Sequence, residues 1–173
     1  MGEGAYNIQD IKCAGRNVPE RVYIFLADGF EEIEGLTVVD LLRRAGIDTV
    51  TVSVMGRREI TGSHRIVVLA DELIENVTPD KTDMLVLPGG MPGTLHLGAC
   101  ESLVGFLKAA DERKSMMAAI CAAPTLFGKL GFLEGKKAIC YPGMEDELIG
   151  AAVTIEPVVT DGHITTSRGL GTA

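Results

Sequence analysis

The sequence has no tryptophan, few aromatic residues of any kind and no closely spaced pair of cysteines. Its four cysteines, at positions 13, 100, 121 and 140, form no Cys-x-x-Cys pair and no cluster with histidine. We therefore expect free thiols, and neither a disulfide framework nor a metal site. No run of about 18 apolar residues is present to span a membrane, and the first 20 residues do not resemble a signal peptide. The cytoplasm is the expected location.

Basic residues are also outnumbered. Sixteen Lys and Arg against twenty-four Asp and Glu give a formal net charge of −8, which opposes binding to nucleic acid or to an anionic membrane. We predict neither partner. The length of 173 residues, with 46% hydrophobic and 23% charged residues, fits one compact domain with a sizeable core.

Strand-like and helix-like stretches alternate along the chain. Apolar or alternating runs predict strands at 21–27, 48–55, 64–70, 83–90, 115–120 and 136–141, and helical periodicity predicts helices at 31–45, 101–114 and 123–133. A hairpin with Asp161-Gly162 at its turn is predicted over 153–167, as an appended antiparallel element. The alternation is typical of an α/β protein with a doubly wound, mostly parallel sheet, in which sites form at the carboxyl ends of strands.

Cys121 lies where a small, apolar strand runs into a helix with Pro124 in its first turn. The residues two before and two after it, Ala119 and Ala123, are small, as the sharp turn of a nucleophile elbow requires. A helix N-terminus favours a thiolate, so we expect the pKa of this thiol to lie below its ordinary value. On these residues alone, a nucleophile and a small buried core residue remain about equally open.

The loop after the strand at 83–90 would meet Cys121 at the same edge of the sheet. Its "LPGG" ends in two glycines, whose backbone can approach a ligand closely. The N–H groups of Gly90 and Ala122 together would form a paired-donor oxyanion site.

The helix after the first strand opens with three acidic residues, in "EEIE". We assign Glu31 and Glu32 to favourable placement at a helix N-terminus, facing solvent. Glu34 is rotated by about 200° from Glu32, so it is predicted to point toward the sheet edge as the acid/base partner of Cys121, with a raised pKa.

Five stretches resemble the ThiJ/PfpI family, and within it the branch of Parkinsonism-associated deglycases and related bacterial proteins. They are "ADGFEEIE", "VDLLRRAG", "VLPGG", "AAICAAP" and "TTSRGLGT", in the family's order and spacing over residues 21–173. The resemblance implies a single domain with a flavodoxin-like fold of the class I glutamine amidotransferase type, no cofactor, and a homodimer that uses the first helix, with Leu36, Val38, Leu42, Arg43 and Arg44. The site residues that it implies are Cys121 as nucleophile, Glu34 as a protonated carboxyl hydrogen-bonded to it, Gly90 and Ala122 as backbone donors, and Gly89 and Tyr141 as candidate substrate contacts.

The resemblance implies two kinds of function, and both depend on Cys121. One is an enzyme of hydrolase or lyase type that converts methylglyoxal or glyoxal to hydroxy acids without glutathione, or repairs early glycation adducts. The other is a non-enzymatic redox sensor or chaperone-like protein switched by oxidation of Cys121. Branch members with a proposed catalytic histidine carry it before a proline, where this chain has Tyr141; tyrosine is a poorer base at neutral pH, so turnover is expected to be slow. The three histidines, His64, His96 and His163, are assigned to surface or structural roles.

Both ends of the chain depart from the family pattern. Residues 1–20 are expected to be an N-terminal extension with Cys13 exposed. Relatives continue after the equivalent of Ala173 into a closing helix, so we expect the domain to lack that helix and the cover that it gives to one face of the sheet.

Overall fold

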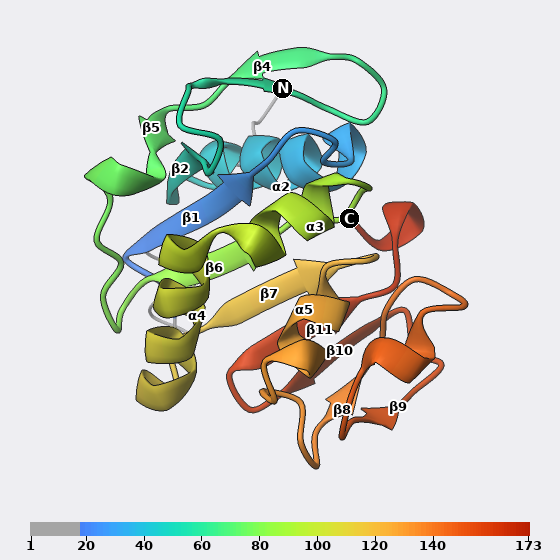
Figure 1. The fold of residues 1–173 in the computed structure, drawn as a ribbon. Helices are drawn as coiled ribbons and strands as arrows, with labels where there is room; N and C mark the ends of the chain where they lie inside the picture. The colour runs from blue at the N-terminus through green and yellow to red at the C-terminus, as the bar shows by residue number, and fades with distance from the viewer. Residues whose placement is uncertain (1–17) are drawn as a thin grey trace, which may run out of the picture.

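The protein is described by a computed structural model that covers residues 18–173 (Figure 1). Residues 1–17, with Cys13 and most of the predicted extension, lie outside the described residues. A seven-stranded sheet has the order β10-β11-β7-β6-β1-β2-β5. Its strands are β1 (Arg21–Leu26), β2 (Asp48–Ser53), β5 (Glu72–Leu73), β6 (Met84–Leu87), β7 (Met117–Ile120), β10 (Val158–Asp161) and β11 (Ile164–Ser167). All neighbours are parallel except β10 and β11, which confirms the predicted α/β class.

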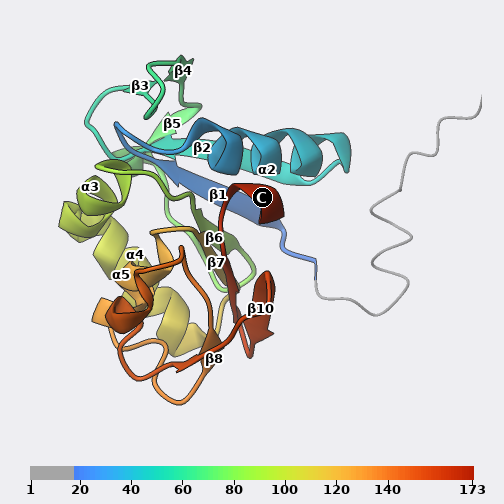
Figure 2. The same ribbon diagram turned by 90° about the vertical axis from the view of Figure 1, so that its right-hand side faces the viewer.

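Helices cover both faces of this sheet. They are α2 (Glu32–Arg44), α3 (Gly93–Ala99), α4 (Glu101–Arg113) and α5 (Pro124–Lys129). Figure 2 shows α3, α4 and α5 on one side of the sheet and α2 on the other. The apolar run of β1 follows from this arrangement, because its alternate side chains enter two cores. Val22 and Ile24 pack on the α2 side, and Tyr23 and Phe25 pack in the larger core opposite.

The predicted C-terminal hairpin is present, and it extends the main sheet at one edge. β10 and β11 pair antiparallel across a turn in which Gly162 has a φ of 62°. β11 also pairs in parallel with β7, with Ile164 opposite Met117. The hairpin therefore supplies an inner strand of the main sheet, and only β10 forms its edge.

Several segments differ from the sequence prediction. The strand expected over 136–141 shrinks to β8 (Lys137–Ala138), which pairs with β9 (Ala152–Val153) outside the main sheet. The strand expected over 64–70 becomes β4 (Val67–Leu69), paired with β3 (Glu59–Thr61). Helix α3 was not predicted, because "PGGMPG" precedes it and reads as a loop. Short 3-10 segments lie at η1 (Ile74–Asn76), η2 (Glu145–Glu147) and η3 (Leu170–Thr172).

The α2 side of the sheet carries an apolar hollow of about 210 Å³ over β6, β7 and β11. Its lining includes Leu42 of α2, Val86 of β6 and Ala118 of β7. Among residues 18–173, α2 and the short C-terminal segment η3 lie on this side (Figure 2). None of the helices in the described part of the chain is both long and apolar enough to cross a membrane.

Candidate active site

The candidate site lies where the winding of the sheet reverses. After β1 the chain forms β2 on one side, and later β6 on the other, so the loops that follow β1 and β6 leave in opposite directions and open a crevice. The loop after β7 joins them. Glu34 follows β1, Gly89 and Gly90 follow β6, and Cys121 follows β7, which brings the three predicted loops to one sheet edge.

Cys121 occupies a sharp turn between β7 and α5. Its φ is 63°, a left-handed conformation that is uncommon for a residue other than glycine. The turn is held on both sides of the cysteine: its N–H donates to the Ser167 carbonyl at 2.9 Å, and its carbonyl accepts from the Tyr141 N–H at 2.8 Å. Ala119 and Ala123 are buried beside it. The thiol is half-buried in a backbone geometry that matches the predicted elbow.

Glu34 is buried next to this thiol. Only 1% of the residue is exposed, and its Oε2 accepts a hydrogen bond from the Gly89 N–H at 3.0 Å. Its Oε1 is also buried and has no hydrogen-bond partner among the described residues. The ion pairs formed within residues 18–173 do not include it. Burial therefore raises the pKa of the Glu34 carboxyl, in the predicted direction.

Two features oppose ionisation of Cys121, the burial of its sulfur and the neighbouring carboxyl of Glu34. With Glu34 ionised, burial of the sulfur and the neighbouring carboxylate raise the pKa of the Cys121 thiol to about 12, although the N–H groups of Ala122 and Gly90 act to lower it. The low thiol pKa predicted from the sequence is thus wrong for an ionised Glu34. Helix α5 has only six residues, so its dipole is too small to outweigh a carboxylate. The two groups titrate together.

Both glycines of the "LPGG" loop are required by close contacts. A Cβ on Gly89 would lie 2.5 Å from Glu34 Oε2 and 2.6 Å from Cys121 Cβ. A Cβ on Gly90, which has a φ of 93°, would lie 2.4 Å from the Glu31 nitrogen. The absence of side chains here lets the carboxyl, the thiol and two backbone N–H groups share one small space.

Tyr141 lies at the edge of this group, with 52% of the residue exposed. Its ring is close to Gly169, because a Cβ on Gly169 would lie 3.7 Å from Tyr141 Cδ2 and 4.0 Å from Glu34 Oε1. Sequence analysis did not select Gly169 as a site residue. Its only signal was its place in "TTSRGLGT", one of the stretches that carry the family resemblance.

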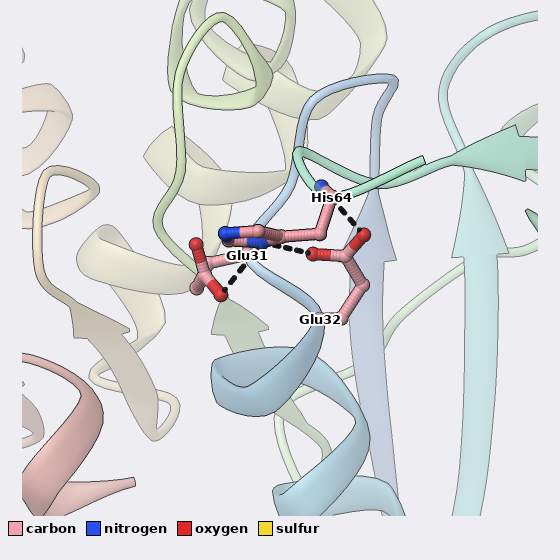
Figure 3. A group of neighbouring side chains, drawn as sticks. All are labelled: Glu31, Glu32 and His64. Carbon is pink, nitrogen blue, oxygen red and sulfur yellow. Dashed lines mark hydrogen bonds and ion pairs between the residues drawn. The ribbon is translucent and has the colours of Figure 1, made fainter. Parts of the chain in front are cut away.

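Glu31, Glu32 and His64 form a separate cluster at the start of α2 (Figure 3). The expectation that Glu32 faces solvent is wrong, because the residue is only 4% exposed. Its Oε1 accepts from the His64 N–H at 2.8 Å, and its Oε2 lies 3.1 Å from the His64 ring Nδ1 and accepts from the Ser63 hydroxyl at 3.1 Å. The three residues could place ligand atoms within 4.8 Å of one another around a cation. Because the Glu32 oxygens are already occupied, we assign the cluster to anchoring the 61–66 loop on α2.

The other two histidines have structural contacts, as predicted. His96 Nδ1 lies 2.9 Å from the Asp28 carbonyl oxygen. His163 Nε2 lies 2.8 Å from Asp111 Oδ1. The hydrogen bonds formed by the described residues do not bring either ring to Cys121.

The fold and site together define an α/β protein with a cysteine on a strand-to-helix elbow beside a buried carboxyl. The chain belongs to the DJ-1/PfpI family, whose pattern matches residues 20–173. Protein dj-1beta of Drosophila melanogaster is 40% identical over 153 residues, which cover 87% of this chain and 81% of that protein. A protein named deglycase from Pyrococcus abyssi is 36% identical over 87% of this chain and 91% of its own length. The chain covers only 35% of Protein DJ-1 homolog B of Arabidopsis thaliana, at 41% identity.

Solved structures of the same family have the same fold. Drosophila melanogaster DJ-1beta superposes with a TM-score of 0.82 at 35% identity, covering 90% of this chain and 84% of that one. An oxidized DJ-1 of Toxoplasma gondii gives 0.81 at 34% identity, covering 88% and 83%. The family resemblance predicted from the five sequence stretches is confirmed.

Proposed function

We propose that the protein acts in defence against reactive carbonyl compounds, as a glutathione-independent enzyme that converts small dicarbonyls such as methylglyoxal to hydroxy acids, or removes early glycation adducts. The observation that carries this proposal is the placement of Cys121, on a strained elbow, beside the buried carboxyl of Glu34, whose Oε1 has no hydrogen-bond partner within residues 18–173. The relative from Pyrococcus abyssi that is named a deglycase supports the same class of reaction.

The reactive form of the pair has its proton on Glu34 and its negative charge on sulfur. Glu34 is almost fully buried, and the ion pairs of the described residues do not include its carboxyl. Burial without a balancing cation favours the neutral acid. A neutral carboxyl removes the repulsion that opposes the thiolate. It also supplies a donor at Oε1, the oxygen that has no hydrogen-bond partner among residues 18–173, and that proton is available to the sulfur or to a substrate.

This arrangement supports an internal redox reaction on methylglyoxal. The thiolate attacks the aldehyde carbon, a C–S bond forms, and the carbonyl electron pair moves to the oxygen, near the N–H groups of Gly90 and Ala122. Glu34 protonates that oxygen, then removes the hydrogen of the attacked carbon as a proton and returns it to the neighbouring carbon. The hydroxyl proton on the attacked carbon passes to the ketone oxygen, so that the first oxygen becomes the thioester carbonyl and the second becomes a hydroxyl. The aldehyde carbon is oxidised to a thioester and the ketone carbon is reduced to an alcohol. Water then cleaves the C–S bond, which releases lactate and regenerates Cys121.

The proposal is tested by lactate production from methylglyoxal with the purified protein. We expect slow turnover, because Tyr141 stands at the edge of the site and is a weak base at neutral pH. Cys121→Ala should abolish the activity, and the matched control Cys100→Ala should retain it because Cys100 lies at the junction of α3 and α4 and not on the elbow. Equal lactate production by the parent and Cys121→Ala would overturn the proposal.

A second function uses the same thiol as an oxidation sensor. It is favoured by the N–H groups of Ala122 and Gly90 that face the sulfur and that could hold the oxygens of a sulfinate. Mild peroxide, consuming two equivalents per thiol, should then add two oxygens to Cys121 before Cys100 or Cys140 reacts. Peptide mass analysis measures this directly, and equal oxidation of all three would contradict the sensor function.

We also propose the cytoplasm as the location and a homodimer as the assembly. The expected free thiols, in a sequence without a Cys-x-x-Cys pair, support the first proposal. Helix α2 supports the second: the predicted face residues Leu36, Val38 and Leu42 are only partly buried, and Ile33 and Leu41 on the same helix are exposed. A small-molecule dicarbonyl or a glycated adduct remains the proposed partner.

A further inference from the structure

A cavity of about 470 Å³ lies between α3, α5 and η2, on the side of the sheet opposite α2 (Figure 2). Most of its lining is apolar, from Met91, Leu95, Val104, Leu126, Leu130 and Met144. Neither Cys121 nor Glu34 is among its lining residues, all of which fall within 18–173, so the cavity is separate from the candidate active site. A cavity of this volume is large enough to enclose most of the surface of a small organic molecule.

The polar groups that line the cavity already have partners. The hydroxyls of Thr94 and Thr125 each donate to a backbone carbonyl, at 3.0 Å and 2.7 Å. Lys129 Nζ lies 3.0 Å from Glu147 Oε2, and both side chains of this ion pair are about half exposed. The lining therefore offers no unpaired charge to a ligand, and a charged group buried there would go uncompensated.

Gly98 keeps the space between α3 and α5 open. It is an exposed residue inside α3, where glycine is less favourable than alanine. A Cβ on Gly98 would meet one atom of the described residues within 4 Å, Leu126 Cδ1 at an ordinary distance of 3.5 Å. Neither crowding nor the backbone conformation thus requires glycine at this position. A larger side chain would project toward Leu126, across the cavity.

We propose that this cavity is a binding site for a small, uncharged and mainly apolar molecule, such as an aromatic compound of two or three rings. The volume sets the size of the ligand, and the paired polar groups of the lining disfavour a charged one. The apolar side chains of Met91 and Leu95, which are 50% and 56% exposed, lie on the lining and would be covered by the ligand. Removal of that surface from water supplies the binding free energy. The site is independent of the reaction proposed for Cys121.

Two fluorescent dyes with one aromatic skeleton test the chemical class of the ligand. N-phenyl-1-naphthylamine is uncharged, whereas 8-anilino-1-naphthalenesulfonate carries one sulfonate group, and both emit more strongly in apolar surroundings than in water. Titration of the purified full chain should give saturable binding of one molecule of the uncharged dye per chain. The sulfonate should bind about tenfold more weakly, because the cavity has no unpaired cation to balance it.

Gly98→Leu tests the place of binding. The leucine side chain would occupy part of the cavity, so the variant should bind the uncharged dye about tenfold more weakly than the parent. Gly105→Leu is the matched control, because Gly105 is also an exposed glycine inside a helix, α4, and a Cβ there meets nothing within 4 Å. Gly105 does not line the cavity, so this variant should bind the dye as the parent does.

A second variant keeps the test informative if Gly98→Leu folds poorly. Glu147→Gln replaces a half-exposed carboxylate and leaves Lys129 without its ion-pair partner. It should strengthen binding of the sulfonate about two- to fivefold and leave binding of the uncharged dye unchanged. Absence of saturable binding by the parent, equal binding of the uncharged dye by the parent and Gly98→Leu, or an unchanged affinity of Glu147→Gln for the sulfonate would overturn the proposed site.

Discussion

Replacing Glu34 tests which of the two site groups holds the proton. If the carboxyl is protonated and donates a hydrogen bond to the sulfur, Glu34→Leu removes a bond to a charged acceptor worth about 1.5–3 kcal/mol, which corresponds to a rise of about 1–2 units in the pKa of Cys121. Glu34→Gln keeps a neutral donor and should give an intermediate value. The expected order of thiol pKa values is therefore parent lowest, Glu34→Gln intermediate and Glu34→Leu highest.

An ionised carboxyl predicts the opposite order. Burial and the carboxylate would then hold the pKa of the Cys121 thiol at about 12 in the parent, and both substitutions would lower it by removing the negative charge. The sign of the change thus separates the two protonation states.

The assay is the ultraviolet absorbance of the thiolate as a function of pH. Each curve is corrected with the same variant in a Cys121→Ala background, which subtracts the other cysteines. Glu31→Gln serves as the control, since it removes one negative charge from the same turn of helix without removing the partner of Cys121. A parent pKa near 12 that falls in Glu34→Leu would refute the protonated carboxyl, and with it the proton transfers in the proposed mechanism.

Three further predictions concern packing, acid stability and assembly. Gly89→Ala should abolish activity and destabilise the fold by about 1–3 kcal/mol, because its methyl group would overlap Glu34 and Cys121. The control Gly105→Ala lies inside α4, where a Cβ meets nothing within 4 Å, so it should stabilise the fold by about 1 kcal/mol and leave activity intact. Urea unfolding measures the stability of both variants, and lactate production measures their activity. Although burial acts to raise the pKa of Glu32, hydrogen bonds from its own N–H, the His64 ring and N–H and the Ile66 N–H lower it from 4.5 to about 2. Its contribution to stability is present above pH 4.5 and is lost as the pH falls toward 2, so Glu32→Gln should flatten this part of the stability profile in urea titrations, and an unchanged acid limb would contradict the assignment. Sedimentation at micromolar concentration should give the mass of a dimer for the parent. Leu41→Glu, a substitution on the exposed face of α2, should shift the mass toward that of the monomer, and a monomeric parent would refute the dimer.

Local features of the sequence identified the elements of the site. The residues that define the elbow lie close together in the sequence: Ala119, Cys121, Ala123 and Pro124. A sharp strand-to-helix turn limits the size and the φ of neighbouring residues, so the elbow could be recognised without any long-range contact. The buried β1 run, the periodicity of α2 and the Gly-Gly loop after β6 could be predicted for the same reason. Because parallel strands end at one edge, the meeting of Cys121 with Glu34 also followed from the order of these elements.

Only the tertiary structure decided what depends on distant partners. Glu32 is buried because the 61–66 loop folds over it and supplies N–H groups, which no periodicity of α2 could reveal. β11 is an inner strand because it pairs in parallel with β7. This pairing places Ile164 opposite Met117, which lies 47 positions earlier in the chain. The pKa of Cys121 depends on how deeply its own sulfur is buried and on the neighbouring Glu34 carboxyl, and Gly169 comes near Tyr141 only once the chain end returns to this side of the site. Burial, register and charge balance arise from contacts between segments far apart in the chain, and those contacts form only when the sheet is assembled.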